Sequence, residues 1–401
     1  MYKKDFPLLQ HHPEIIYLDS ASTAEKPDQV ISALTHLYTH EYANIHRWAY
    51  TLSEKSELLF EASKEKLRIF LNADSRYEIV YTYSATYAMN YLARSLADSG
   101  IISHWDTIVL SVLDHHANIV PWQLIARALN LQIRWIGVTE DGRLDLTDLE
   151  TKIQWAKLVA VTAASNVTGA ITDIANIRDI VRKASWDDAI LVIDASQALP
   201  HFAVDVVELD IDFLIATGHK MMSDTWLGIL YGKKKYLQKL EPAFCWGGAI
   251  NHVSVDGYEA AGLPYRHEPG TPHIAGAASL LAALEYIESI GGYSAIESYE
   301  SDLIHYTLSK IATLPDTIWL IGPRDAHHRL WVFSFSLIWH HPSDIADSLA
   351  DRGICVRVWH HCTEPLHHAL GVPATLRMSL YIYNTRDDID AFFDALILVC
   401  K

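Results

Sequence analysis

Cysteine is scarce in this sequence: only Cys245, Cys355, Cys362 and Cys400 occur among 401 residues. So long a chain with so few cysteines does not carry the disulfide framework that holds small secreted domains together. The sequence therefore predicts reduced thiols and a cytoplasmic protein.

Long apolar runs and an excess of positive charge are also missing. No stretch approaches the roughly 18 consecutive apolar residues of a membrane span. No apolar segment follows the two lysines near Met1, so no signal peptide is expected. With 32 basic and 49 acidic side chains, the net charge is −17. An acidic surface disfavours binding to nucleic acid and to anionic membranes, so we expect neither as a partner.

Internal repeats, low-complexity tracts and Pro/Ser-rich linkers are absent as well. Short β-branched runs instead alternate with helical patterns between about residues 78 and 232. Several runs are apolar at nearly every position, as in parallel strands buried on both faces, which predicts an α/β domain with a mainly parallel sheet. The expected strands are Glu78–Thr82, Thr107–Val112, Gln132–Ile136, Leu158–Thr162, Ile190–Ile193 and Phe213–Ala216, and the expected helices include Thr86–Leu96 and Asp173–Ala184.

The pattern changes after Gly270. Because 401 residues exceed what one core usually organises, we predict a large α/β domain at residues 15–270 and a smaller α+β domain at residues 271–401. Helices near the N-terminus, within residues 27–72, are expected to pack partly on the small domain. The expected elements are helices at 27–43, 54–71 and Gly276–Ile290, the last ended by Gly291 and Gly292 in the left-handed conformation, and strands within Leu330–Leu337 and Leu376–Ile382.

Polar residues follow two of the expected strands, at the edge of an open α/β sheet where ligands gather. Lys220 follows the strand Phe213–Ala216, and it is either a solvated strand end or a reactive amine. Asp194 ends an uncharged run, and a buried aspartate needs a cationic partner unless it caps a helix. The protonated pyridine nitrogen of pyridoxal phosphate is such a partner, and this proton makes the ring an electron sink. Gln197 would then reach the phenolic oxygen of that ring.

Two further strand ends carry polar residues. Ser84-Ala-Thr86 lies between a strand and a helix, where backbone N–H groups bind an anion, although many helices simply begin with Ser or Thr. His115, in Asp114-His-His-Ala-Asn118, follows the next strand. It either stacks on an aromatic cofactor and exchanges protons near neutral pH, or belongs to a surface turn.

Seven short motifs, spread over nearly the whole chain from about Ile16, carry a resemblance to a known family. The sequence resembles the class V, fold-type I pyridoxal-phosphate enzymes, and among them the SUF-type cysteine desulfurases and the related selenocysteine lyases. This resemblance implies a fold-type I transferase: a mainly parallel seven-stranded sheet between helices, plus a smaller α+β domain. The motifs are Tyr17-Leu-Asp-Ser-Ala21, His115-His-Ala-Asn-Ile-Val-Pro-Trp122, Ser165-Asn-Val167, Gly218-His-Lys220, Pro269-Gly-Thr-Pro272, His360-His-Cys362 and Tyr383-Asn-Thr385.

The resemblance also implies which residues hold pyridoxal 5'-phosphate around its ring. Lys220 would form the Schiff base, Asp194 would pair with the pyridinium and His115 would stack on the ring. Gln197 and Asn166 would lie beside the phenolic oxygen of the ring and the substrate next to it.

The phosphate of the cofactor has its own set of implied ligands. Thr86, Thr217 and His219 would hold it, and Thr271 would reach it from the partner subunit of a homodimer. Ala85 stands beside them where the family has a phosphate-facing threonine.

Arg377 and Cys362 match the substrate-binding and nucleophilic positions of the family. The planar fork of an arginine suits the substrate carboxylate, and a thiolate suits attack on sulfur. The resemblance implies that L-cysteine, or L-selenocysteine, is converted to the amino acid L-alanine. Its sulfur becomes a persulfide on Cys362 and is delivered to an acceptor protein, as in iron–sulfur cluster assembly.

The surroundings of Cys362 leave alternatives open. His360 or His361 would lower the pKa of the thiol if either were protonated. A loop thiol without function is one alternative, and a metal site with His367 and His368 is another. The spacing matches no common zinc pattern, and no metal is expected. The other three cysteines are expected to pack in apolar surroundings.

The sequence departs from the family at three loop positions where tryptophan replaces glycine: Trp48, Trp226 and Trp359. Indole adds a large rigid surface and removes the backbone freedom of glycine. Neutral change is one interpretation. The other is a pocket reshaped for a different reaction, which would make the chain another pyridoxal-phosphate lyase or aminotransferase.

Overall fold

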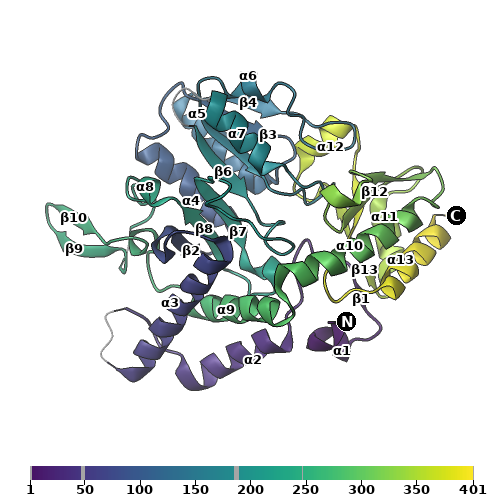
Figure 1. Cartoon of the computed structure of the whole chain (residues 1–401), viewed down its shortest axis with the longest axis horizontal. Helices are drawn as coiled ribbons and strands as arrows, with labels where there is room; N and C mark the ends of the chain where they lie inside the picture. Colours follow the sequence, from purple (N-terminus) through teal and green to yellow (C-terminus); the bar gives the residue numbers. More distant parts are fainter. Residues whose placement is uncertain (1, 47–49, 185–188, 246, 401) are drawn as a thin grey trace.

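A seven-stranded sheet forms the centre of the larger part of the molecule (Figure 1). The computed structural model describes residues 2–46, 50–184, 189–245 and 247–400. The strand order is β2-β8-β7-β6-β5-β3-β4, and every pair is parallel except those that β8 makes with β2 and β7. The predicted α/β, fold-type I architecture is therefore confirmed. The strands are β2 (Ile79–Thr82), β3 (Thr107–Ser111), β4 (Gln132–Ile136), β5 (Ala156–Thr162), β6 (Ile190–Asp194), β7 (Phe213–Thr217) and β8 (Gly228–Gly232).

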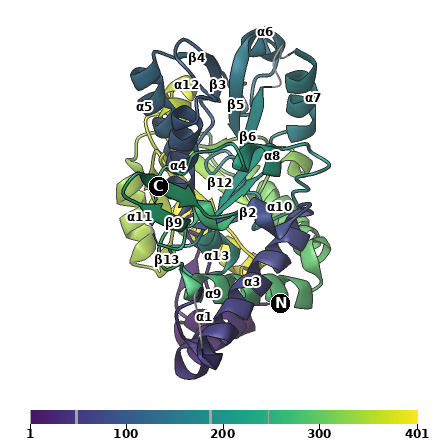
Figure 2. The ribbon, with the colours of Figure 1, turned by 90° about the vertical axis from the view of Figure 1, so that its left-hand side faces the viewer.

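Helices cover both faces of this sheet, as Figure 2 shows from the side. Alternate residues of one strand face opposite layers: Val159 of β5 packs in the cluster that contains α3, α7 and α9, and Leu158 packs in the cluster that contains α4 and α5. Because both faces are covered, nearly every position of the central strands is apolar. The helices are α2 (Asp28–His36), α3 (Thr51–Leu71), α4 (Ala85–Asp98), α5 (Val120–Leu129), α6 (Leu149–Ile153), α7 (Ile174–Ala184), α8 (Lys234–Leu237) and α9 (Ile274–Ser289).

A second, smaller sheet lies near the C-terminal end of the chain. Its antiparallel order is β11-β12-β15-β14, and helices α10, α11 and α13 pack with it. Phe6 and Leu18 from the N-terminal segment join the same core, and β1 (Ile16–Tyr17) pairs with β13 (Ile354–Cys355). The remaining elements are α1 (Pro7–His11), β9 (Ile250–Ser254), β10 (Gly257–Ala260), α10 (Gly292–Ile311), β11 (Ile318–Ile321), β12 (Val332–Leu337), α11 (Pro342–Ala350), β14 (Arg357–Trp359), α12 (Glu364–Leu370), β15 (Thr375–Ser379) and α13 (Arg386–Val399).

Helix α9 connects the two hydrophobic cores. Its first half, including Leu280, packs with the large sheet, whereas Tyr286 and Ile287 near its end pack with the small one. The predicted division at residue 270 falls just before this shared helix and stays a prediction.

Most differences between the expected and observed elements lie at their ends. All six predicted strands of the large sheet are present, but β8 was not predicted from its short Gly-Ile-Leu-Tyr-Gly run. The helix expected at 27–43 is α-helical only to His36, and a π-helical turn, Leu37–Glu41, follows it. Gly291 and Gly292 have φ angles of 104° and 70°, which confirms the left-handed end of α9.

Across the described ranges, no single helix is long and apolar enough to cross a membrane. Helices α9 and α10 pass that test only as a pair, and their axes are bent by 71° where they meet.

Candidate active site

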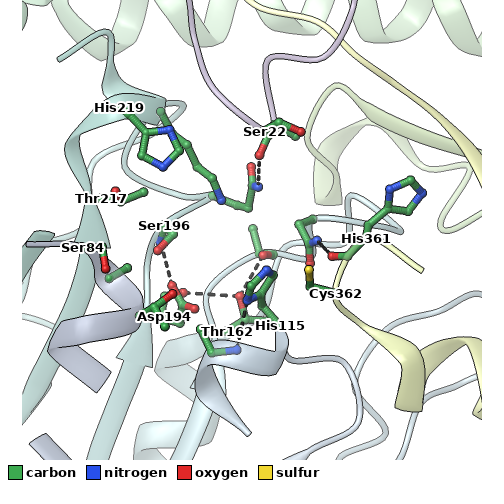
Figure 3. Close-up of a pocket in the computed structure, with 18 of the residues that line it drawn as sticks. Ser22, Ser84, His115, Thr162, Asp194, Ser196, Thr217, His219, His361 and Cys362 are labelled. Carbon is green, nitrogen blue, oxygen red and sulfur yellow. Dashed lines mark hydrogen bonds between the residues drawn. The ribbon is translucent and has the colours of Figure 1, made fainter. Parts of the chain in front are cut away.

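A cavity of about 200 Å³ opens at the carboxyl ends of β6 and β7, beside the loop that contains Cys362 (Figure 3). Of the twelve residues predicted for the site, Thr271 alone does not line it. The eleven that do are Ala85, Thr86, His115, Asn166, Asp194, Gln197, Thr217, His219, Lys220, Cys362 and Arg377.

Lys220 and Asp194 reach the cavity from the ends of two adjacent strands. Strand β6 ends at Asp194, and Lys220 lies in the 3-10 turn Gly218–Met221 that directly follows β7. Burial lowers the pKa of Lys220 to about 8, although the charge of Asp194 opposes the shift. About a tenth of this amine is therefore unprotonated at pH 7, and this is the form that a nucleophile or base requires. Asp194 is buried, and its Oδ1 accepts a hydrogen bond from the backbone N–H of Ser196 (2.9 Å).

The start of α4 forms an anion site at one end of the cavity. Ser84 caps this 14-residue helix, and its Oγ accepts a hydrogen bond from the N–H of Tyr87 (3.0 Å). The helix dipole and the free N–H groups of the first turn favour a phosphate there. Thr217 and His219 line the cavity with Ser84 (Figure 3). Burial and the nearby charge of Lys220 lower the pKa of His219 to about 4, so its imidazole is neutral.

His115 enters the cavity as a neutral imidazole with a defined tautomer. Its Nδ1 accepts a hydrogen bond from the N–H of Ala117 (3.0 Å), so the proton of the neutral ring lies on Nε2. Burial, with the charge of Lys220, lowers its pKa to about 3.

Buried polar atoms of the cavity-lining residues include two close to Asp194 in the sequence that have no hydrogen-bond partner in the described chain, Ser196 Oγ and Gln197 Oε1. Gln197 itself is anchored, because its Nε2 donates to the carbonyl of Ala21 (2.8 Å). Buried polar atoms are rarely left without a partner, so these two indicate a polar ligand. Together with the lysine, the aspartate and the anion site, they fit pyridoxal phosphate.

Arg377 belongs to a polar network that the sequence did not predict. Its Nη1 donates to the carbonyl of Asn166 (3.0 Å), and its Nη2 donates to Asp19 Oδ1 (2.8 Å) and Ser22 Oγ (2.7 Å). Arg357 also donates to Ser22 Oγ (2.6 Å) and lines the cavity. Among the described residues, no group accepts a hydrogen bond from the buried Nε of Arg377, so a donor remains for a carboxylate. Only the motif Tyr17-Leu-Asp-Ser-Ala21 could have indicated Asp19 from the sequence.

Hydrogen bonds fix the loop of Cys362 to the segments that follow strands β3 and β5. The N–H of His116 donates to the carbonyl of Cys362 (2.7 Å), and Asn166 Nδ2 donates to the carbonyl of His361 (2.8 Å). Thr363 Oγ1 donates to Asn166 Oδ1 (3.1 Å). Cys362 itself is exposed, and it lines the same cavity as Lys220.

One expectation about the cysteines is wrong, and one of the two histidines beside Cys362 is excluded as a source of positive charge. Burial, together with the charge of Arg377, lowers the pKa of His361 far below its usual range. His361 is therefore neutral and cannot supply a positive charge to the thiol of Cys362. Cys245 does not pack in apolar surroundings: it is exposed, 3.6 Å from the hydroxyl of Tyr258.

The histidines around Cys362 are engaged with the protein. His361 Nε2 lies 2.9 Å from Thr375 Oγ1, and His360 Nε2 lies 2.8 Å from the carbonyl of Pro373. In the part of the chain that the structure describes, no group of three or more His, Cys, Asp or Glu residues is arranged to hold a metal ion.

Two of the three tryptophans that replace glycine lie in the described residues, and these two do not narrow the cavity. Neither Trp226 nor Trp359 lines it, and their side chains are 71% and 52% exposed. Trp48 lies outside the described residues. The cavity therefore gives no support to the interpretation that these two tryptophans reshape it for another reaction.

Known proteins share this architecture over the whole chain. The model of the family described as Aminotransferase class-V matches residues 16–392. This chain belongs to the class V aminotransferase family, whose cofactor is pyridoxal 5'-phosphate. It is similar to a probable cysteine desulfurase of Streptomyces coelicolor, with 40% identity over 98% of this chain and 95% of the relative.

Solved structures support the same family assignment. The cysteine desulfurase of Thermococcus onnurineus superimposes with a TM-score of 0.94 and 35% identity, covering 99% of this chain and 97% of that one. A cysteine desulfurase of Escherichia coli superimposes with a TM-score of 0.90 and 32% identity over the same shares.

Proposed function

We propose that this protein is a pyridoxal-phosphate-dependent cysteine desulfurase that takes sulfur from L-cysteine, leaves L-alanine and keeps the sulfur as a persulfide on Cys362. The observation that carries the proposal is the shared cavity. An exposed thiol, a lysine with a lowered pKa and an arginine with an unpartnered Nε line one space of about 200 Å³. An aminotransferase has no use for the thiol.

Each end of the cofactor has matching residues. Lys220 would hold its aldehyde carbon, Asp194 its ring nitrogen, and the first turn of α4, with Thr86, Thr217 and His219, its phosphate. His115 would lie against the ring, and Gln197 would form a hydrogen bond with its phenolic oxygen. The bound cofactor supplies an electron sink for the carbon skeleton of the substrate.

The reaction then requires three actions from the chain. Arg377 binds the α-carboxylate of L-cysteine, and Lys220 in its amine form takes the α-proton. The thiolate of Cys362 attacks the substrate sulfur. An S–S bond forms, the Cβ–S bond breaks, and its electron pair stays with the carbon skeleton, which is reprotonated to give L-alanine. Cysteine and one protein thiol thus become alanine and one protein persulfide, and no external oxidant is needed.

Product analysis tests this reaction. The purified, cofactor-saturated protein is incubated with L-cysteine and a thiol reductant, and alanine and sulfide are measured. We expect equal amounts of alanine and sulfide, and mass spectrometry without reductant should find one added sulfur on the peptide that contains Cys362. Pyruvate and ammonia in place of alanine would instead identify a lyase, and the proposal would be abandoned.

The homodimer is proposed for a separate reason. Thr271 is exposed and does not line the cavity of its own subunit, as expected of a residue that reaches the phosphate of a partner. The hairpin β9–β10 also projects from the molecule (Figure 1). Its apolar side chains Val253 and Val255 are exposed. Apolar side chains exposed together often mark an interface. Light scattering should give twice the mass of the chain, and a monomer that binds the cofactor tightly would contradict the shared site.

Because Cys362 is exposed, a protein thiol can approach it, and we propose an acceptor protein that feeds iron–sulfur cluster assembly in the cytoplasm. L-Selenocysteine is a second candidate substrate, because selenium is attacked in the same way as sulfur. Transfer of labelled sulfur from the Cys362 persulfide to a candidate acceptor would test the partner directly.

A further inference from the structure

Five tryptophans have the left-handed backbone that normally belongs to glycine. The φ angles are 73° at Trp105, 65° at Trp155, 63° at Trp226, 72° at Trp339 and 86° at Trp359. A positive φ is a genuine outlier for a bulky side chain, whereas glycine adopts it without a steric penalty. One residue type thus supplies five of the twelve non-glycine residues with positive φ in the described ranges.

The other four tryptophans in the described ranges behave normally. Trp122 and Trp331 are fully buried, and Trp135 and Trp319 lie in strands β4 and β11. By contrast, the five left-handed side chains are 52% to 88% exposed, so burial of the indole compensates little for the strain. The tryptophans therefore form two classes. Those of the first class are buried or lie in a strand, as is usual for tryptophan, whereas those of the second class are exposed and have a backbone conformation that is usual only for glycine.

The positions themselves are typical of glycine. Trp155 stands in the two-residue link between α6 and β5, where a helix-to-strand connection commonly uses a left-handed glycine. Trp226 and Trp359 are two of the positions at which the sequence departs from a glycine of the family it resembles. The chain also contains 18 glycines, whereas the usual share of about 7% would give roughly 28.

We propose that the cell that encodes this chain inserts glycine, not tryptophan, at positions 105, 155, 226, 339 and 359. One codon explains both amino acids: UGA is a stop codon in the standard genetic code, and reassigned codes read it as tryptophan or as glycine. The five left-handed positions are then encoded by UGA, and the four tryptophans of the core and strands by the ordinary tryptophan codon UGG.

This change alters the segment that follows Lys220 and the segment that precedes Cys362. Position 226 lies in the loop between the turn of Lys220 and strand β8, and position 359 ends β14, three residues before Cys362. Glycine at these two positions removes two exposed indoles from the loops that border the reacting groups.

The protein purified from the organism that encodes it provides the test. Its peptides are sequenced by mass spectrometry, with those that contain Trp122 and Trp331 as internal controls, and the codons of all nine positions are read from the gene. We expect glycine and UGA at the five left-handed positions, and tryptophan and UGG at the controls. Tryptophan in the five native peptides, or UGG at their codons, would overturn the proposal.

Discussion

Replacing the five left-handed tryptophans by glycine in a recombinant protein is expected to stabilise the fold. A left-handed conformation costs a non-glycine residue about 1–2 kcal/mol. Part of this gain is lost when glycine is introduced, because the greater conformational freedom of glycine in the unfolded chain lowers the stability by about 0.4–1 kcal/mol. The net gain is about 0.5–1 kcal/mol per position, or roughly 3–5 kcal/mol for all five if the effects add.

The shift in melting temperature follows from the size of the chain. An unfolding entropy of about 2.1 cal/mol/K per residue corresponds to about 0.8 kcal/mol/K for this protein, so the five replacements should raise Tm by roughly 4–6 °C. Scanning calorimetry on the two cofactor-loaded proteins measures this difference.

The exposed residue Trp319 offers a matched control. It is 48% exposed, close to the 52% of Trp359, but it lies in β11 with an ordinary strand backbone. Trp319→Gly should therefore lower the stability by more than about 0.5–1 kcal/mol, because glycine weakens a strand and the half-buried indole is lost. If the five-fold variant melts at or below the temperature of the tryptophan-containing protein while Trp319→Gly behaves as expected, the reasoning from backbone strain is refuted.

Three further outcomes are expected at the active site. Cys362→Ser should keep the visible absorbance of the bound cofactor, but mass spectrometry should find no persulfide. An added sulfur on another residue of the variant would mean that this other residue is the nucleophile. Arg377→Ala should raise KM for L-cysteine roughly 10²-fold, since a charged hydrogen-bonding group is lost, and an unchanged KM would mean that another group binds the carboxylate. Because burial lowers the pKa of Lys220 to about 8, the cofactor-free protein should gain stability as the pH rises from about 8 towards 10.5: over that range the unfolded chain keeps a proton that the folded chain has released. Denaturant titrations of the cofactor-free protein would show this rise, and Lys220→Met should abolish it.

The sequence predicted the parts of the site that follow strands and missed those that depend on tertiary packing. Lys220 and Asp194 could be found because buried parallel strands are easily recognised and their carboxyl ends meet. Arg357 and Ser22 lie in segments without such a pattern, and they approach the cavity only when β14 and the N-terminal segment pack together.

Burial also decides protonation, which no motif reveals. His361 looked like a possible source of positive charge beside Cys362, but it is buried near Arg377 and stays neutral. Similarly, three tryptophans could be recognised as departures from the family, whereas the left-handed backbone of Trp105, Trp155 and Trp339 was visible only in three dimensions.

Asn166 has a consequence for which amino acids the enzyme can accept. Its backbone carbonyl holds Arg377, and its side chain holds the loop of Cys362 through His361 and Thr363. One residue thus sets the span between the group that binds the carboxylate and the atom that receives the sulfur. The site therefore selects its substrate by length. In an amino acid with one more methylene between the α-carbon and the sulfur, the sulfur would not be aligned with the thiol of Cys362, even if the cofactor bound that amino acid well.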